Sequence, residues 1–365
     1  MAEAQEATER YLELVSGLGN NPAAEAMAHG RLAKIKEAQG DLDDAKESYT
    51  LQFELAQTVG KEDIQKAALE GISRVAFNQD DHEGYIEYST ILVQALPDAQ
   101  AQKKAQLYTN IGSIYLSMQN FDEAEANLRS ALNLYNELES QESVYKALKT
   151  LASVYHAKGS RTEQAAVLQE RAALAEELGL LEEKCELDLE AGMIYLKQGF
   201  SDTALPLLEA ACHVAITEGF GSLVARVFPA AQQALHDLGY YPELADNIQA
   251  QLELDAGMEA EKKVKLQSNL GYALRKQEKW GEAARVEEDA AATAMGAGNV
   301  EEAAKLAGSA AALFEQAGES AEHERLMKKR VEYLKQNQEQ DQFSSLYDYA
   351  YTLTKQKKLK PAAEE

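Results

Sequence analysis

The stretch from Asn110 to Leu132, NIGSIYLSMQNFDEAEANLRSAL, decides the fold of this chain. It places small and large apolar residues at helical spacing, then a turn with Asn or Gly, then a second amphipathic segment. The same pattern returns at multiples of about forty residues, as in NLGYALRKQEKWGEAARVEEDAA from Asn269 and AGMIYLKQGFSDTALPLLEAA from Ala191. A helix-turn-helix hairpin that recurs in this way predicts a stack of similar units rather than closed domains.

Small residues recur at one place in the first helix of each unit, which we number position 8. They are Ala33, Gly112, Ala152, Gly192, Gly271, Ala311 and Ala350. Ile72 and Gln232 do not fit, and the small residues directly before them, Gly71 and Ala231, indicate a local shift of one residue. Two helices approach to about 8–10 Å only where the contact residues are small, so the spacing predicts close packing of paired helices.

These residues resemble the tetratricopeptide repeat. Large residues at position 11, such as Tyr115 and Tyr155, and small ones at position 20, such as Ala124 and Ala204, fit the same motif. The resemblance implies an all-α superhelical solenoid of antiparallel helix hairpins, with about eight repeats and a truncated ninth. The period exceeds the usual length of about 34 residues, and in this the chain resembles kinesin light chains and spindle-orientation adaptors.

We expect three parts in this solenoid. Residues 1–20 form an N-terminal capping helix, residues 21–335 form eight repeats, and residues 336–365 form a polar connection and a C-terminal half-repeat that caps the stack. The first segment carries apolar or small residues on one helical face, namely Ala4, Ala7, Tyr11, Leu12 and Val15. The repeat pattern continues from one end to the other without a convincing domain boundary.

The composition of the chain bears on which partners it can bind and on where in the cell it is expected. Lys and Arg number 36 against 61 Asp and Glu, so the net charge of −25 repels polyanions and predicts no nucleic-acid partner. No run approaches the roughly 18 apolar residues of a membrane span, so we expect no membrane insertion. Two cysteines are too few for a disulfide framework, and Met1 to Arg10 lacks the features of a secretory signal. A cytoplasmic location is therefore predicted.

No arrangement of catalytic residues is recognisable in the sequence. The chain lacks a Gly-rich phosphate loop, a His-Glu-x-x-His motif and a nucleophile elbow, and its six histidines are scattered. We therefore expect no catalytic residues, no metal and no cofactor. Cys185 and Cys212 fall at the two ends of one hairpin, which predicts that they are neighbours, as small buried hydrophobes or as a redox pair.

Basic residues mark the candidate binding surface. The resemblance implies that positions 2, 5, 9 and 12 of each first helix line a concave groove in which partners bind. Position 2 is basic in five of nine units, where 36 basic residues in 365 predict about one. The candidate groove residues are Lys66, Lys146, Arg226, Lys265 and Lys305 at position 2, Lys149 and Arg275 nearby, and the position-6 asparagines Asn110 and Asn269. An ordinary solvated helix face explains the same stripe.

These observations predict a protein-protein interaction scaffold or adaptor. It would capture a protein or peptide segment in the groove, and the basic stripe would select an acidic one. A regulatory repeat protein that responds to a signalling peptide is the alternative, and an enzyme is a third. The carboxylate clamp of co-chaperone repeats is matched at two of its five positions, by Asn110 and Lys146 and again by Asn269 and Lys305.

Overall fold

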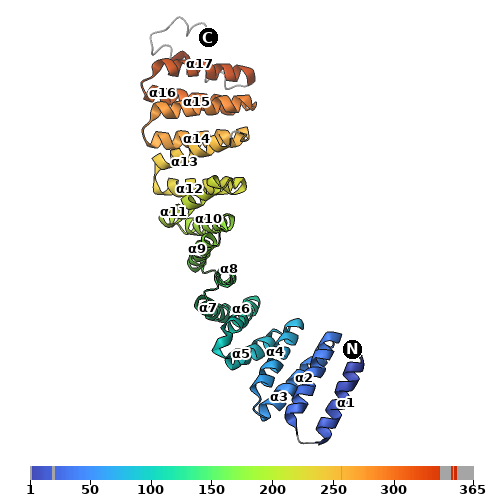
Figure 1. Ribbon diagram of the computed structural model, residues 1–365. Coiled ribbons are helices and arrows are strands. Elements are labelled where there is room, and N and C mark those ends of the chain that lie inside the picture. Colours follow the sequence, from blue (N-terminus) through green and yellow to red (C-terminus); the bar gives the residue numbers. More distant parts are fainter. Residues whose placement is uncertain (1, 19–20, 256, 338–346, 348, 352–365) are drawn as a thin grey trace. The chain divides into compact units, whose positions relative to one another are not determined.

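The regular structure of this chain is helical. The computed structural model describes residues 2–18, 21–255, 257–337, 347 and 349–351 (Figure 1). Within these residues it contains α-helices and one short 3-10 helix, η1, and no strand. Residues 1–180 and residues 181–365 form two compact units, and within each of them every helix packs on the next along the chain, so the predicted all-α solenoid of helix hairpins is confirmed.

The helices group into two compact units, residues 1–180 and residues 181–365, which we call unit 1 and unit 2. Unit 1 opens with α1 and continues with four hairpins, each made of a first and a second helix. Its elements are α1 (Ala2–Leu18), α2 (Pro22–Gln39), α3 (Leu42–Thr58), α4 (Glu62–Asn78), α5 (His82–Ala95), η1 (Asp98–Gln100), α6 (Ala101–Ser117), α7 (Phe121–Glu137), α8 (Gln141–Lys158) and α9 (Arg161–Glu177).

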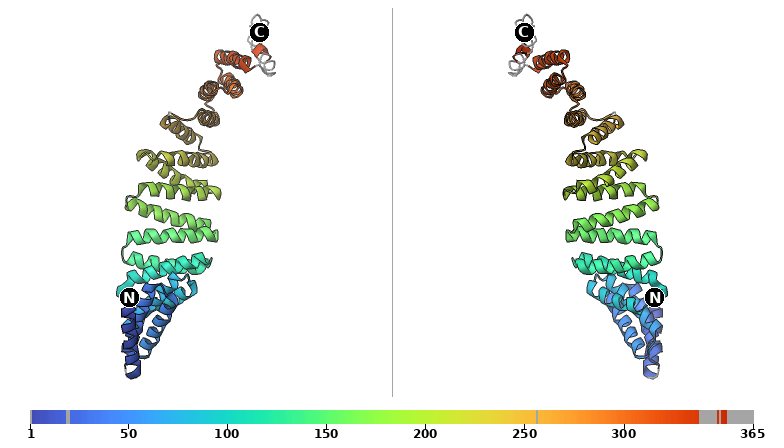
Figure 2. Two further views of the ribbon diagram at one scale, coloured as in Figure 1. Left: turned by 90° about the vertical axis from the view of Figure 1, so that its right-hand side faces the viewer. Right: turned by 90° about the vertical axis from the view of Figure 1, so that its left-hand side faces the viewer.

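Unit 2 consists of four further hairpins in the same order. Its elements are α10 (Leu181–Lys197), α11 (Ser201–Thr217), α12 (Gly221–Leu238), α13 (Tyr241–Leu254), α14 (Ala260–Lys276), α15 (Trp280–Gly296), α16 (Val300–Gln316) and α17 (Ser320–Asn337). Within each unit the helices stack in chain order, as the two side views of Figure 2 show.

The helices of the two units begin at corresponding residues. Adding 159 to the first residue of each helix from α2 to α9 gives the first residue of the matching helix from α10 to α17, so that Pro22 gives Leu181 and Arg161 gives Ser320. Even the irregular helices correspond, since α5 and α13 both have 14 residues where α3 and α11 have 17. Unit 2 therefore repeats the helical plan of unit 1.

Small residues allow close contact within the hairpins. A Cβ atom on Gly112 of α6 would lie 2.8 Å from Cγ of Leu128 and 3.2 Å from the carbonyl oxygen of Ala124, both on α7. A Cβ atom on Gly192 of α10 would similarly lie 2.7 Å from Leu208 on α11. Real Cβ atoms do not fit at such distances, so these positions hold small residues because the helices meet there.

The second repeat follows a register different from the one expected. Position 8 lies nine residues before the start of the second helix, as Gly112 does before Phe121, and this distance from His82 leads to Ser73. The expected shift toward Gly71 is therefore wrong in direction. The cause is the short helix α5, which stops before Pro97 and shortens this repeat by one residue. Gly71 serves another contact, because its Cβ would lie 2.5 Å from the ring of Tyr49 on α3.

Gln232 stays in register, so the shift expected at Ala231 is also wrong. Its side-chain Nε2 donates hydrogen bonds to Oδ1 of Asn247 at 3.1 Å and to Oε1 of Gln251 at 2.9 Å, both on α13. A polar bridge thus replaces the small-residue contact between α12 and α13. Hydrogen bonding satisfies these amides, which makes a large polar residue acceptable at this half-buried position.

The second helices begin with negative charge. An Asp or Glu stands in the first turn of every second helix from α3 to α17, for example Glu123 in α7 and Glu282 in α15. Each such carboxylate interacts favourably with the helix dipole, by about 0.3–1 kcal/mol at an exposed site. Much of the acidic excess of the chain therefore has a structural explanation.

The core of unit 2 includes both cysteines and the sole tryptophan. Cys185 and Cys212 are buried in one hydrophobic cluster, and Cys185 Sγ lies 3.3 Å from the carbonyl oxygen of Ala211, which precedes Cys212. Trp280 packs against the same cluster, and Tyr349 is buried in it. The rest of the expected cap, residues 338–346, 348 and 352–365, lies outside the described residues.

Candidate partner-binding surface

The predicted groove residues all lie on first helices of hairpins. In unit 1, Lys66 lies on α4, Asn110 on α6, and Lys146 and Lys149 on α8. In unit 2, Arg226 lies on α12, Lys265, Asn269 and Arg275 on α14, and Lys305 on α16. The structure thus distributes them over two units, and each unit offers its own candidate surface.

Lys66 does not belong to the basic stripe. With Ser73 at position 8, position 2 of this helix is Ala67, and Lys66 comes one residue earlier. Its ammonium lies 3.5 Å from the carboxylate of Glu62 on the same helix, and its side chain is only 19% exposed. The enrichment of basic residues at position 2 is therefore weaker than the sequence indicated, because the register of this repeat differs by one residue from the expected one.

Several of the remaining cations are already paired with carboxylates. Arg226 lies 3.7 Å from Glu186, Arg275 lies 3.4 Å from the buried Glu287, and Lys305 lies 3.4 Å from Glu302. Within the described residues, by contrast, the exposed ammonium groups of Lys146, Lys149 and Lys265 have no ion pair. These three can interact with a partner without first breaking a contact.

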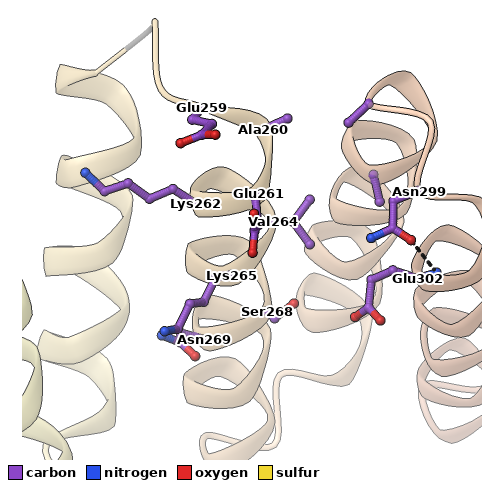
Figure 3. Close-up of a pocket in the computed structure, with 12 residues that line it drawn as sticks. Glu259, Ala260, Glu261, Lys262, Val264, Lys265, Ser268, Asn269, Asn299 and Glu302 are labelled. Atoms are coloured by element: carbon purple, nitrogen blue, oxygen red, sulfur yellow. Dashed lines mark hydrogen bonds between the residues drawn. The ribbon is translucent and has the colours of Figure 1, made fainter.

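Lys265 and Asn269 lie one helical turn apart on α14 (Figure 3), and both of them line two hollows. One hollow of 760 Å³, the α14–α16 hollow, is lined by both residues and by others near the start of α16, including Asn299 and Glu302. The other, of 550 Å³, is the α12–α14 hollow. It is lined by Pro229, Gln232, Gln233, His236, Leu244, Ile248, Lys265, Asn269 and Tyr272. The structure therefore places two predicted residues where a ligand can reach them from both sides.

The two hollows differ in charge. The α14–α16 hollow combines Lys262 and Lys265 with three carboxylates, Glu259, Glu261 and Glu302. At its edge, Oδ1 of Asn299 accepts a hydrogen bond of 3.2 Å from the backbone N–H of Glu302 and caps α16. The lining of the α12–α14 hollow contains Lys265 and His236 and no carboxylate. In a chain with a net charge of −25, this hollow is a locally favourable place for an anionic group.

An aromatic cluster forms one wall of the α12–α14 hollow. The ring of His236 lies 5.7 Å from that of Tyr272, and Tyr272 meets Tyr241 edge-on at 6.1 Å. The ammonium of Lys276 lies 5.5 Å from the centre of the Tyr272 ring. Such rings offer flat apolar faces with polar tips, which suit contact with a peptide. Gln233 and Tyr272 occupy position 9, so a search of that position in the sequence would have found them.

The candidate surface of unit 1 is occupied by its own side chains. Asn110 Nδ2 donates a hydrogen bond of 3.1 Å to the hydroxyl of Tyr85, and its Oδ1 accepts one of 3.0 Å from Gln106. Lys103 pairs with Glu70 nearby. Asn110 is half-buried, whereas Asn269 is exposed. The two predicted asparagines thus differ in their availability.

Within the residues that the structure describes, no group of three or more His, Cys, Asp or Glu side chains could hold a metal ion. None of the helices found there has the length and apolar character needed to cross a bilayer. The features that stand out are the polar and aromatic side chains around α14.

The helical stack and its exposed polar surface define a helical-repeat protein. The model of the tetratricopeptide-repeat family matches residues 105–138, which include most of α6 and all of α7. Residues 105–138 therefore form a tetratricopeptide repeat. No curated protein sequence matches it.

Several solved structures are similar to this chain at low identity. Naa15/Naa10 bound to HypK-THB is 14% identical with a TM-score of 0.46, over 97% of this chain and 55% of that chain, so this chain spans about half of its length. The TPR2AB-domain:pHSP90 complex of yeast Sti1 is 15% identical with a TM-score of 0.39, over 80% and 98%. YrrB, a TPR protein with an unusual peptide-binding site, is 17% identical with a TM-score of 0.38, over 64% and 98%.

Proposed function

We propose that this chain is a non-catalytic scaffold or adaptor that binds a segment of a protein partner along the first helices of unit 2. The observation that carries the proposal is the position of Lys265 and Asn269, exposed on α14 between two hollows. Stacked repeats present extended surfaces of this kind, and such surfaces serve mainly in binding.

The side chains at this surface match the groups of a peptide. The amide of Asn269 offers both a donor and an acceptor, as a backbone peptide group requires. The ammonium of Lys265 is free to pair with a carboxylate, which favours an acidic segment. Pro229 and the ring of Tyr272 provide apolar contact area in the α12–α14 hollow. Together these groups bind a chain segment by its backbone, its charge and one apolar side chain.

A charge-reversal variant tests this function. Arg226, Lys265 and Lys305 are changed to Glu, and partner recovery from the native extract is compared with that of the wild type by quantitative mass spectrometry. The control reverses Lys279, Arg285 and Lys328, which lie in a turn and on the second helices α15 and α17, and so changes the net charge equally. We expect the first variant to lose its partners, the control to keep them, and helical content to stay the same in both.

Salt dependence provides a second measure of the same contact. Exposed charges are screened beyond about 8 Å at physiological ionic strength, so a salt bridge to Lys265 weakens as salt rises. Lys265→Glu alone should account for most of the loss, because Arg226 and Lys305 already have carboxylate partners. Equal partner recovery by the triple variant and the control, or recovery that ignores salt, would contradict the proposed function.

A further inference from the structure

The α12–α14 hollow has a counterpart in unit 1. A hollow of 320 Å³ there is lined by residues of α4, α5 and α6. Six of its lining residues have equivalents 159 positions later in the lining of the α12–α14 hollow. The pairs are Glu70 and Pro229, Ser73 and Gln232, Arg74 and Gln233, Phe77 and His236, Tyr85 and Leu244, and Asn110 and Asn269.

The helices that carry the asparagines also correspond in sequence. Residues 101–112 read AQKKAQLYTNIG and residues 260–271 read AEKKVKLQSNLG. Both follow a short second helix, α5 or α13, so the same irregularity precedes each hollow. The two hollows are therefore one surface present twice in the chain.

In unit 1, the polar groups of this surface bind one another. The phenol of Tyr85, which is only 4% exposed, accepts the hydrogen bond from Asn110, and Gln106 donates to the same asparagine. Glu70 pairs with Lys103, and Arg74 donates to Glu37 at 2.6 Å. Ser73 is the exception, because its buried hydroxyl has no hydrogen-bond partner. A ligand that used Asn110 would first have to displace Tyr85 or Gln106.

In unit 2, two of these internal partners, Tyr85 and Glu70, are replaced by residues that have no side-chain hydrogen-bonding group. Leu244 stands in place of Tyr85 and has no hydroxyl, so the side chain of Asn269 makes no hydrogen bond within the described part of the chain. Pro229 stands in place of Glu70, and the ammonium of Lys262 has no carboxylate partner there. Lys265 stands in place of Gln106 and adds a positive charge beside the freed asparagine.

We propose that the two hollows are duplicated binding sites of which the one in unit 2 is open and the one in unit 1 is closed by its own side chains. The open site takes an extended peptide segment with a carboxylate side chain. Asn269 binds the backbone of that segment and Lys265 binds the carboxylate, since no carboxylate lines this hollow. The assignment of a peptide ligand rests on the proposed function, whereas the closure of unit 1 rests on its internal hydrogen bonds.

A matched pair of variants tests the closure without any ligand. Asn110→Ala and Asn269→Ala make the same change at corresponding places in a helix, so the gain in helix propensity is equal in both. Asn110→Ala also removes the hydrogen bond to the buried Tyr85. We expect its thermal midpoint to lie about 2–4 °C below that of Asn269→Ala. Equal midpoints, or a lower one for Asn269→Ala, would overturn the proposal.

Peptide binding tests the open site. Two pools of fluorescein-labelled decapeptides are compared by fluorescence anisotropy, one with Glu and one with Gln at alternate positions. We expect the wild type to prefer the Glu pool, Asn269→Ala to weaken that binding about tenfold, and Asn110→Ala to have a smaller effect. Leu244→Tyr should also weaken it, because a phenol at this place can occupy Asn269 as Tyr85 occupies Asn110.

The outcomes separate this proposal from the proposed function. Failure of both pools to bind the wild type would contradict peptide binding itself and, with it, the open site. Binding that Asn110→Ala weakens as much as Asn269→Ala, or a preference for the Gln pool, would overturn the proposal alone. If Leu244→Tyr does not fold, the pair of asparagine variants still decides the matter.

Discussion

Unit 1 and unit 2 begin their helices at corresponding residues, yet the corresponding surfaces differ in whether their polar side chains are bound within the unit. Around α6, Asn110 and Lys103 are bound by Tyr85 and Glu70, whereas around α14, Asn269 and Lys262 are left free by Leu244 and Pro229. Tyr85 and Leu244 are buried to the same extent, 4% exposed, so the two units differ here in hydrogen bonding rather than in burial. The residue at this buried position thus contributes to the availability of an asparagine on the neighbouring helix.

A second difference concerns the first hairpin of each unit. In unit 1, Tyr49 donates a hydrogen bond of 3.0 Å to Glu37, and Arg74 donates to both of them. The corresponding residues of unit 2 are Leu208, Leu196 and Gln233. Unit 1 therefore joins α2, α3 and α4 by a polar cluster, where unit 2 uses apolar packing. The helical plan tolerates both solutions because each satisfies or removes its buried polar groups.

The largest expected effect concerns the thiols, which both belong to unit 2. Burial raises the pKa of Cys185 to about 11 and that of Cys212 to about 12. The thiolate is the reactive form, so at pH 8 we expect labelling by a disulfide reagent to be at least about a hundredfold slower in the folded chain than in urea. The labelling rate should increase as the pH approaches the raised pKa values.

This measurement also separates the units, because unit 1 contains no cysteine. A labelling rate that is equal in the folded and unfolded chains would contradict the burial of both thiols. Thiol labelling could then no longer report the opening of unit 2 separately from that of unit 1.

The next effect compares two equivalent glycines. A Cβ on Gly112 would lie 2.8 Å from Leu128 and 3.2 Å from a backbone carbonyl oxygen, whereas the nearest atom to a Cβ on Gly271 would be Cγ of Glu287, at 3.1 Å. Gly112→Leu should therefore lower the free energy of unfolding by about 2–3 kcal/mol, and Gly271→Leu by less, in urea unfolding followed by circular dichroism.

Thiol labelling assigns each glycine effect to its unit. Gly271→Leu should speed the labelling of Cys185 and Cys212, because all three residues belong to unit 2. Gly112→Leu lies in unit 1 and should leave the labelling slow if the two units unfold separately. A near-zero cost for Gly112→Leu would show that the helix contact is wrongly placed.

The smallest effect tests the polar cluster of unit 1. Glu37→Gln removes a charge-assisted pair of hydrogen bonds from Arg74 and should lower the free energy of unfolding by about 1–2 kcal/mol at pH 7. Hydrogen bonding from Arg74 holds the pKa of the Glu37 carboxyl below its usual value. The stabilisation is therefore present above the unfolded pKa and disappears as the pH falls through the lowered folded pKa.

The wild type and Glu37→Gln should accordingly converge in stability in acid, which serves as an internal control. A difference between them that persists unchanged at low pH would show that the substitution acts through packing rather than through the ion pair.

Sequence periodicity predicted the hairpins well, because the contacts that define them are local. The small residues at Gly112, Gly192 and Ala311 lie within a helix pair, and their spacing follows from helix geometry. The register of the second repeat was predicted wrongly, because its period depends on where α5 ends. That end is set by Pro97 and a short connection rather than by the repeating apolar pattern.

The sequence pointed to some residues of the candidate surface and missed others, because it shows positions within a repeat and not contacts between helices. Lys265 and Asn269 were found because they repeat at fixed positions, whereas Lys66 was misplaced by the one-residue error. Position 2 alone could not show that Arg226 pairs with Glu186, that Arg275 pairs with Glu287, or that Gln233 and Tyr272 line the same hollow as Lys265. Such contacts join different helices, and the position of a residue within its own repeat does not contain them.

The sequence by itself thus determined the helical class, the hairpin unit and the residue types presented by the first helices, since each depends on periodicity within about forty residues. Only the tertiary structure decided which of those residues remain available. Asn110 and Asn269 occupy the same place in the same local pattern, and they differ because Tyr85 on α5 reaches one and Leu244 on α13 leaves the other free. A hydrogen bond between side chains on neighbouring helices depends on distance and direction in space, which only the packed structure fixes.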